Sequence, residues 1–194
     1  MVLIGKQSDV IYSYADYLKW DDSERWELIN GVAYNMSPAP SRKHQKISQV
    51  LSRELGNCLK GKPCEIYCAP FDVRLPLGAE DDSSIINVVQ PDIVVVCNKS
   101  KLDEHGCNGA PDLVIEILSP GTAKMDLVYK LNLYEKAGVM EYWVVHPTDH
   151  TIMVFKLAED GRYGRYELYE QSERLTVGIL PELILDLNEI FAES

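Results

Sequence analysis

Leu113-Val114-Ile115-Glu116-Ile117-Leu118 is a continuous apolar run with a single acid inside it, and Val88 to Val96 is a second such run around Pro91-Asp92. Runs of this kind are typical of central strands that are covered on both faces, whereas half-buried strands alternate between apolar and polar residues. We therefore predict two buried strands at the centre of a sheet, each carrying one carboxylate.

The remaining elements surround these strands in the order helix, hairpin, helix, strands, helix, strand and hairpin. Periodicity, caps and turn residues predict helices over 13–18, 41–59, 124–137 and 187–191, hairpins at Asn30-Gly31 and Asp160-Gly161, and strands over 71–75 and 142–145. One mixed β-sheet with helices packed on its faces accommodates this order most simply. The predicted fold class is α/β or α+β, with N-terminal and C-terminal hairpins.

Length and charge restrict the function. The chain has 194 residues, which fits a single domain over residues 8–194. Lys and Arg number 19 and Asp and Glu number 30, so the net charge is −11. This balance argues against a protein that holds duplex nucleic acid by bulk electrostatics, because phosphate neutralisation requires a basic surface.

Cysteine usage and apolar patterning predict the compartment. The five cysteines have no regular spacing, which predicts reduced thiols in a reducing compartment. The sequence shows no basic leader with a cleavage-type stretch and no apolar segment of the ~20 residues that a membrane span needs. We expect a cytoplasmic protein without a membrane contact, and the sequence leaves a homodimer open.

Asp92 and Glu116 are the informative anomaly, because an unpaired ionised carboxylate is costly to bury. If the two strands are neighbours, both acids can face one point, where at ~4 Å and an effective dielectric of about 20 they would repel by about 4 kcal/mol. A divalent cation removes this repulsion, and Mg²⁺ suits two carboxylates because it keeps several waters. The alternatives are salt bridges to Lys or Arg, or a protonated Glu116.

Lys130 is the candidate cation beside these acids. On the predicted helix it lies between Tyr134 on the apolar stripe and Asp126 just off it, so its ammonium could reach a site at the end of the sheet. There it could position water or balance negative charge. The alternative is an exposed Asp126–Lys130 pair at i, i+4 spacing.

Other polar residues have weaker signals. Glu27 shares one face of its hairpin strand with Ile29, where it could support the site or face water, and Asp72 lies beside Arg74 on what we expect to be a solvated strand face. The densest basic cluster consists of Arg42, Lys43, His44 and Lys46 in the first turns of the second helix. A helix N-terminus with added cations is a phosphate-contact candidate, and a solvated helix face is the alternative.

Together these motifs resemble the Uma-two family, whose members are restriction-endonuclease-like proteins of the PD-(D/E)XK nuclease superfamily. The resemblance runs from about Tyr14 to Phe191, and it rests on segments at 26–31, 36–38 with His44, 71–75, 90–96, 111–120 and 130–143. It implies a restriction-endonuclease-like core with a metal site at one end of a central mixed sheet.

The resemblance also implies roles for single residues. Pro91-Asp92 matches the PD element, Glu116 matches the acid of the (D/E)XK element, and Leu118 stands where the motif lysine would be. Lys130 on the following helix matches the relocated lysine of this family. Glu27 matches an acid found near such sites, while His44 and Asp72 fall at further motif positions whose roles stay open.

The predicted function is a Mg²⁺-dependent endonuclease (Mn²⁺ being an alternative) that hydrolyses DNA phosphodiester bonds. Asp92 and Glu116 are the expected metal ligands, Lys130 and Glu27 the further catalytic residues, and Arg42, Lys43, His44 and Lys46 the expected nucleic-acid contacts. The acidic net charge predicts weak, salt-sensitive or partner-dependent DNA binding. A catalytically weak or inactive binding module on the same fold and a phosphoesterase for small nucleotides are the competing hypotheses.

Overall fold

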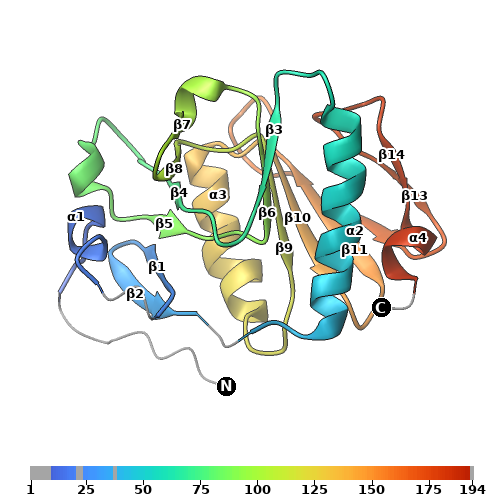
Figure 1. Cartoon of the computed structure of the whole chain (residues 1–194), viewed down its shortest axis with the longest axis horizontal. Helices are drawn as coiled ribbons and strands as arrows, with labels where there is room; N and C mark the ends of the chain where they lie inside the picture. Colours follow the sequence, from blue (N-terminus) through green and yellow to red (C-terminus); the bar gives the residue numbers. More distant parts are fainter. Residues whose placement is uncertain (1–9, 21–23, 37–38, 193–194) are drawn as a thin grey trace.

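Three β-sheets and a few helices build the structure, a computed structural model that describes residues 10–20, 24–36 and 39–192 (Figure 1). The helices and helical turns are α1 (Tyr14–Tyr17), α2 (Arg42–Leu59), η1 (Asp82–Ser84), η2 (Lys99–Lys101), η3 (Met125–Lys130, a π-helical segment), α3 (Leu131–Ala137) and α4 (Leu187–Phe191). The strands are β1 (Trp26–Ile29), β2 (Val32–Asn35), β3 (Glu65–Cys68), β4 (Val73–Arg74), β5 (Val88–Val89), β6 (Ile93–Val96), β7 (Leu102–Asp103), β8 (Gly106–Asn108), β9 (Leu113–Ile117), β10 (Glu141–His146), β11 (Thr151–Lys156), β12 (Glu167–Glu170), β13 (Arg174–Thr176) and β14 (Ile184–Asp186).

The central sheet has the order β12-β11-β10-β9-β6-β3, and only its β9–β10 pair is parallel. Its two faces bury separate apolar clusters. One face packs against α2, α4 and the β13–β14 ribbon, and the other packs against α3 and the sheet β2-β1-β5-β4-β8-β7 (Figure 1). The predicted mixed α/β class, with helices on a mixed sheet, is therefore confirmed.

Local signals in the sequence explain several elements. Ser13 and Asp16 form the capping box that begins α1, and Asn30 and Gly31 have φ of 51° and 74°, as the tight turn between β1 and β2 requires. Gly138 ends α3 with φ of 88°, a conformation in which a side chain would be strained.

The predicted single strand from Val88 to Val96 is wrong. Val88–Val89 pair within the sheet β2-β1-β5-β4-β8-β7, which we call the N-terminal sheet. Ile93–Val96 pair within the central sheet. The break falls at Gln90 and Pro91, because proline has no N–H for a ladder and the Gln90 N–H donates to the Glu27 side chain instead. The chain therefore passes between the two sheets immediately before Asp92.

The predicted solvated strand face is wrong for Arg74, whereas its neighbour Asp72 is half-buried. Arg74 is only 1% exposed; its guanidinium donates to Asp82 and Asp103 at 2.7 and 2.5 Å and lies over the Tyr14 ring. Alternation along the strand predicted that Arg74 is exposed to solvent. That pattern carries no information about the segments from elsewhere in the chain that cover this side chain.

A disulfide contradicts the expectation of reduced thiols. β3 pairs with β6 so that Glu65 opposes Val96, which makes Cys64 and Cys97 the next opposed positions, and their sulfurs are bonded. Cys58, Cys68 and Cys107 are free thiols. Strand register, which the cysteine spacing does not reveal, brings the bonded pair together.

No helix within the described ranges is long and apolar enough to cross a bilayer.

The C-terminal segment is held by a buried carboxylate at the start of β10. Glu141 is 2% exposed and accepts hydrogen bonds from the Trp143 indole and from the backbone N–H groups of Gly178 and Ile179. This acid joins the central sheet to the segment that leads into β14.

We predict that Glu141→Ala lowers the free energy of unfolding by about 2–4 kcal/mol, because the buried Trp143 indole N–H and two part-buried backbone N–H groups lose their acceptor. Urea unfolding followed by circular dichroism measures the change. The control is Glu167→Ala, which removes an exposed ion pair with Lys156 and should cost less than about 1 kcal/mol. Equal effects of the two substitutions would contradict the anchoring role of Glu141.

Candidate active site

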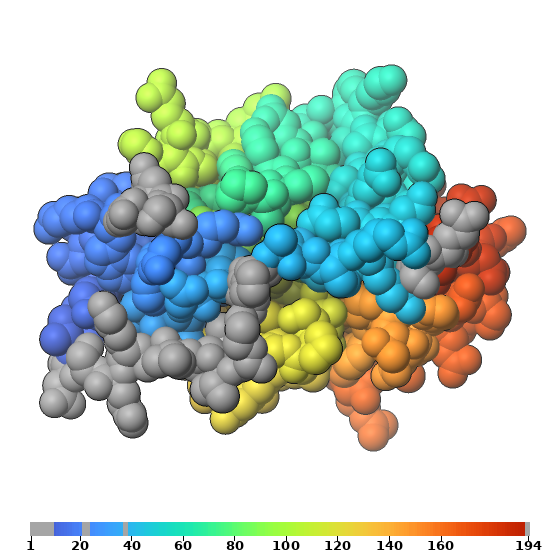
Figure 2. All heavy atoms as spheres, turned by 60° about the horizontal axis from the view of Figure 1, so that its bottom comes forward, coloured from blue at the N-terminus to red at the C-terminus, as the bar shows by residue number. Residues whose placement is uncertain are grey.

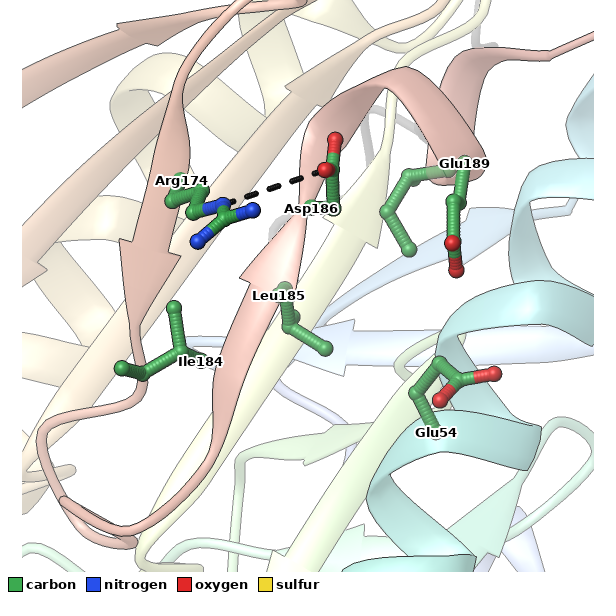
Figure 3. A pocket seen from close by; sticks show the side chains of 7 residues that line it. Glu54, Arg174, Ile184, Leu185, Asp186 and Glu189 are labelled. Atoms are coloured by element: carbon green, nitrogen blue, oxygen red, sulfur yellow. Dashed lines mark ion pairs between the residues drawn. The ribbon is translucent and has the colours of Figure 1, made fainter.

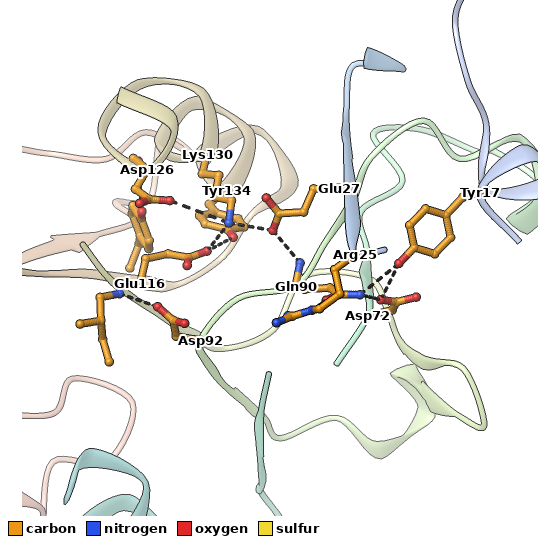
Figure 4. A network of polar contacts seen from close by, with 12 residues as sticks. Tyr17, Arg25, Glu27, Asp72, Gln90, Asp92, Glu116, Asp126, Lys130 and Tyr134 are labelled. Carbon is orange, nitrogen blue, oxygen red and sulfur yellow. Dashed lines mark hydrogen bonds and ion pairs between the residues drawn. The ribbon is translucent and has the colours of Figure 1, made fainter. Parts of the chain in front are cut away.

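Asp92 and Glu116 meet because of the register between β6 and β9. Ile93 opposes Ile115 in this antiparallel pair, so Asp92, one residue before β6, opposes Glu116. Directly opposed residues point to the same face with Cβ atoms about 5 Å apart. Figure 4 shows both carboxylates pointing into the same region, and Asp92 Oδ2 accepts the N–H of Ile117, which follows Glu116.

Each of these two carboxylates is held through one oxygen. Glu116 Oε1 accepts from Lys130 Nζ at 2.9 Å and from the Tyr134 hydroxyl at 2.8 Å. Asp92 Oδ2 accepts from the Ile117 N–H at 2.8 Å and lies 3.1 Å from His44 Nε2. Within the described ranges, Glu116 Oε2 and Asp92 Oδ1 have no hydrogen-bond partner. The protein thus orients both acids and leaves one oxygen of each available.

Lys130 is the centre of a buried ionic cluster. Its ammonium lies 2.8 Å from Glu27 Oε1, 2.9 Å from Glu116 Oε1 and 3.8 Å from Asp126 Oδ1 (Figure 4). Lys130 and Asp126 are each 3% exposed, so the exposed i, i+4 pair considered as an alternative is wrong. The three acids come from β1, β9 and η3, and one ammonium therefore connects both large sheets and the helix between them.

The helix that carries Lys130 begins with a π-helical segment, Met125–Lys130. Such wide turns are rare and occur frequently at functional sites. Here the wide turn buries Met125, Asp126 and Lys130, while Leu127, on the predicted apolar stripe, is only half-buried. Tyr134, one turn further along α3, adds its hydroxyl to the same cluster.

Burial and crowding of like charges shift the titration of this cluster. Desolvation raises the pKa of Glu116 well above its usual value against the attraction of Lys130, and the nearby carboxylates of Asp126, Asp92 and Glu27 add to the rise. Desolvation also raises the pKa of Asp126 to about 6, although Lys130 opposes this shift. The cluster therefore binds protons more tightly than exposed carboxylates do.

Lys130 stays charged in spite of its burial. Desolvation lowers its pKa, but the Glu116, Glu27 and Asp126 carboxylates outweigh that effect and hold the pKa well above the usual value. The Tyr134 hydroxyl stays protonated, because burial and the adjacent Glu116 raise its pKa. Both groups consequently act as hydrogen-bond donors to Glu116, and neither is a base.

The predicted site residues divide into two groups. Asp92, Glu116, Lys130 and Glu27 come together at one end of the central sheet, and His44 joins them from the first turn of α2. His44 is 8% exposed and its Nδ1 has no partner among the described residues, so it faces Asp92 rather than open solvent.

The other basic residues of the cluster lie beside this site. Arg42 is exposed, Lys43 and Lys46 are half-buried, and Lys43 Nζ lies 3.0 Å from His150 Nε2. Figure 2 shows the start of α2 and the turn that leads into α3 meeting on one face of the molecule, in agreement with Figure 1. The cationic start of α2 is therefore at the same end of the sheet as the acids.

Sequence reasoning missed three participants. Asp126 and Tyr134 lie four residues before and after Lys130, and this spacing was interpreted as an exposed ion pair and as part of the apolar stripe, not as two further site residues. Gln90 had no usable signal, because its role depends on its backbone N–H, which donates to Glu27 Oε1 at 2.8 Å.

Mg²⁺ is the cation that the sequence predicts for these donors. Within 10–20, 24–36 and 39–192, no group of three or more His, Cys, Asp or Glu side chains gathers as a metal site. The two oxygens left available, Asp92 Oδ1 and Glu116 Oε2, are hard donors on opposed residues, and Mg²⁺ accepts one or two carboxylates with water completing its shell. The residues present therefore fit Mg²⁺ as a two-carboxylate site.

Comparison with known proteins identifies the family of this chain. The fold is shared with a crystal structure described as "a putative nuclease belonging to DUF820" from Anabaena variabilis ATCC 29413, which superposes with a TM-score of 0.74 and 20% identity, over 93% of this chain and 97% of that one. Residues 14–188 match the family model "Uma2: Putative restriction endonuclease", and the chain belongs to this family. The "Uncharacterized protein slr1290" of Synechocystis sp. (strain ATCC 27184 / PCC 6803 / Kazusa) is 29% identical over 163 residues, which cover 82% of this chain and 81% of that protein.

The raised pKa of Asp126 makes stability depend on pH. Because the folded chain holds this proton more tightly than the unfolded chain, the contribution of Asp126 is fully present below pH ~4 and is lost as pH rises through about 6. We predict that the stability of Asp126→Asn relative to the original protein increases by about 3 kcal/mol between pH 4 and pH 8.

Urea unfolding across this pH range measures that difference. Asp160→Asn, at an exposed turn, is the matched control for loss of a carboxylate. A stability difference for Asp126→Asn that falls as pH rises would contradict the tight proton binding of the cluster.

Proposed function

We propose that this protein is a Mg²⁺-dependent endonuclease that hydrolyses DNA phosphodiester bonds. The observation that carries the proposal is the opposed pair Asp92 and Glu116, each fixed through one oxygen and each with the other oxygen available, beside the Lys130 ammonium. Membership of the Uma2 family supports a nuclease-type function.

In this proposal Asp92 and Glu116 hold the ion. A bound Mg²⁺ stabilises charge on phosphoryl oxygens and activates water for attack. Lys130 and Tyr134 keep Glu116 Oε1 engaged, so that its other oxygen is directed away from them. Glu27 holds Lys130 from the opposite side at 2.8 Å and thus acts as a positioning residue. His44 and Ile117 orient Asp92 in the same way.

DNA would reach the site along the start of α2. Arg42 is exposed there, and the Lys43 and Lys46 side chains are half-buried beside it, next to the helix N-terminus that carries partial positive charge. The rest of the surface opposes binding, because the net charge is −11. The proposal therefore requires weak binding that depends on a few local phosphate contacts.

A second candidate function is a catalytically weak or inactive binding module on the same fold. The observation that favours it is that Lys130 already forms ion pairs with both Glu116 and Glu27, in a cluster whose ionic side chains are about 4–6% exposed. Metal binding and cleavage, measured separately, distinguish the two candidates.

We predict that Mg²⁺ raises the melting temperature of the original protein and that Asp92→Asn and Glu116→Gln each abolish this shift. With a Kd of ~1 mM, ~10 mM Mg²⁺ should stabilise the fold by about 1.4 kcal/mol, since the ion binds only the folded chain. For a chain of this size that corresponds to roughly 3–6 °C, measurable by differential scanning fluorimetry with Mg²⁺ or Mn²⁺.

Asp149→Asn, which removes an exposed carboxylate, should keep the shift. Cleavage of plasmid, single-stranded DNA and RNA is then measured with the same variants, and loss of either ligand should slow DNA cleavage by about 100-fold or more. Metal binding without cleavage would favour the binding module. Cleavage that persists in both variants would contradict the proposed active site.

We also predict that Arg42→Gln and Lys46→Gln weaken DNA binding without changing sequence preference, because phosphate contacts position the nucleic acid but do not identify bases. Each substitution should reduce the slope of log K against log salt by about 1. Fluorescence anisotropy of labelled DNA between about 50 and 200 mM salt measures the slope. An exposed lysine distant from the site, Lys136, is the control, and an equal effect of Lys136→Gln would contradict a localised contact.

A further inference from the structure

A cavity of about 280 Å³ lies beside the proposed active site and takes no part in the proposed cleavage reaction. Its walls come from the N-terminal region and the N-terminal sheet. The lining residues are Tyr17, Leu18, Trp20, Glu24, Arg25, Trp26, Asp72 and Gln90.

Three aromatic rings supply flat apolar surface to this cavity. Trp20 lies 5.7 Å from Tyr17 and 5.6 Å from Trp26, measured between ring centroids, and the rings are tilted rather than stacked on one another. All three are only half-buried, so ring surface remains accessible. Accessible aromatic faces of this kind bind flat heteroaromatic rings, and the bases of nucleic acids stack on them regardless of base identity.

A connected polar group made of Arg25, Asp72, Gln90 and the Tyr17 hydroxyl lines the same cavity (Figure 4). The side-chain amide of Gln90, which is 8% exposed, donates to Asp72 Oδ1 at 2.8 Å and to the Tyr17 hydroxyl at 3.1 Å. Its carbonyl oxygen accepts from Arg25 Nε at 2.8 Å. Within the described ranges this arrangement satisfies Gln90 completely and leaves Asp72 Oδ2 as an acceptor and the terminal nitrogens of Arg25 as donors.

The unpaired atoms select against a phosphate and for a neutral base. Glu24 and Asp72 contribute two carboxylates against one guanidinium, so the cavity does not favour a phosphate group. A nucleobase offers amino or imino N–H donors for Asp72 Oδ2 and ring or carbonyl acceptors for Arg25. Desolvation raises the pKa of Asp72, against the hydrogen bonds from Gln90 and Tyr17 and the attraction of Arg74 and Arg25.

Gln90 also connects this cavity to the acids. Its backbone N–H donates to Glu27 Oε1, and Glu27 pairs with Lys130. Asp92 follows only two residues after Gln90, and two residues of extended chain span at most ~7 Å. A base in the cavity and a phosphate of the same strand near Asp92 are thus compatible with the reach of a single nucleotide.

We propose that the cavity bounded by Tyr17, Trp20 and Trp26 binds one unstacked nucleobase through Asp72 and Arg25. The location beside the acids rests on the proposed nuclease function, but base binding itself does not require metal or cleavage. The ligand class is a nucleoside monophosphate or one base of a single strand.

Tryptophan fluorescence tests the proposal directly. Trp20 and Trp26 line the cavity, whereas Trp143 is fully buried in the core. Titration with GMP, AMP, CMP and dTMP in EDTA should quench the emission saturably. Asp72→Asn and Arg25→Gln should each weaken the Kd by about tenfold, because each removes a charged hydrogen-bond partner.

The matched control is Glu189→Gln, in a second cavity of about 300 Å³ that contains the Arg174–Asp186 pair (Figure 3). This variant should keep the original Kd. Arg25 is exposed, so Arg25→Gln keeps the test valid if Asp72→Asn fails to fold. The melting temperature of each variant identifies such a failure.

Three outcomes would overturn the proposal: no quenching at millimolar nucleotide, equal quenching by ribose 5-phosphate, or equal quenching by tyrosinamide, which has a ring but no base edge. Nuclease assays keep the two proposals apart. Base binding without DNA cleavage would remove the nuclease function and leave the cavity assignment. Cleavage without base binding would remove the cavity assignment alone.

Discussion

One buried ammonium holds the functional end of this molecule together. Lys130 lies within 4 Å of carboxylates from β1, β9 and the turn before α3, and these elements belong to both large sheets and to the helix between them. Without this cation, carboxylates ~4 Å apart would repel by about 4 kcal/mol per pair at an effective dielectric near 20. This charge is therefore one of the contacts that set the mutual position of the two sheets at this end.

Such a cluster is a poor way to gain stability. Replacing buried ion pairs by well-packed apolar side chains is frequently neutral or stabilising, because desolvation offsets the attraction. Raised pKa values at a shared, sparsely accessible position are instead frequent at functional sites. The hydrogen bonds of each acid support the same conclusion. Glu116 and Asp92 each use one carboxylate oxygen for contacts within the described residues, and the other oxygen has no hydrogen-bond partner there. Orientation of this kind places the two carboxylates in position before any bound partner is present.

The sequence predicted those features that follow from short-range pattern. The buried strand of Glu116, the turn at Asn30-Gly31 and the helix begun at Ser41 depend on neighbours within a few residues, and the structure confirms them. Asp92 and Glu116 were recognisable because an acid in an apolar run is an anomaly that needs a partner.

What the sequence did not reveal depends on distant segments or on backbone atoms. Arg74 was predicted to face solvent because Asp82 and Asp103, which bury and neutralise it, are brought by other segments. The Cys64–Cys97 bond depends on the register of β3 against β6. Gln90 acts partly through its N–H, a group that every residue except proline carries, so no residue type could indicate it.

Gln90 is also where the two halves of the functional end meet. Its backbone N–H contacts the acid that holds Lys130, and its side chain contacts Asp72 in the aromatic cavity. The chain leaves the N-terminal sheet after Val89 and enters the central sheet at Ile93, so Gln90, Pro91 and Asp92 form the passage between them. A shift of either sheet must therefore move this short passage. Because proline fixes φ at its centre, this passage has fewer accessible conformations, which restricts how far the cavity and the acids can move relative to each other.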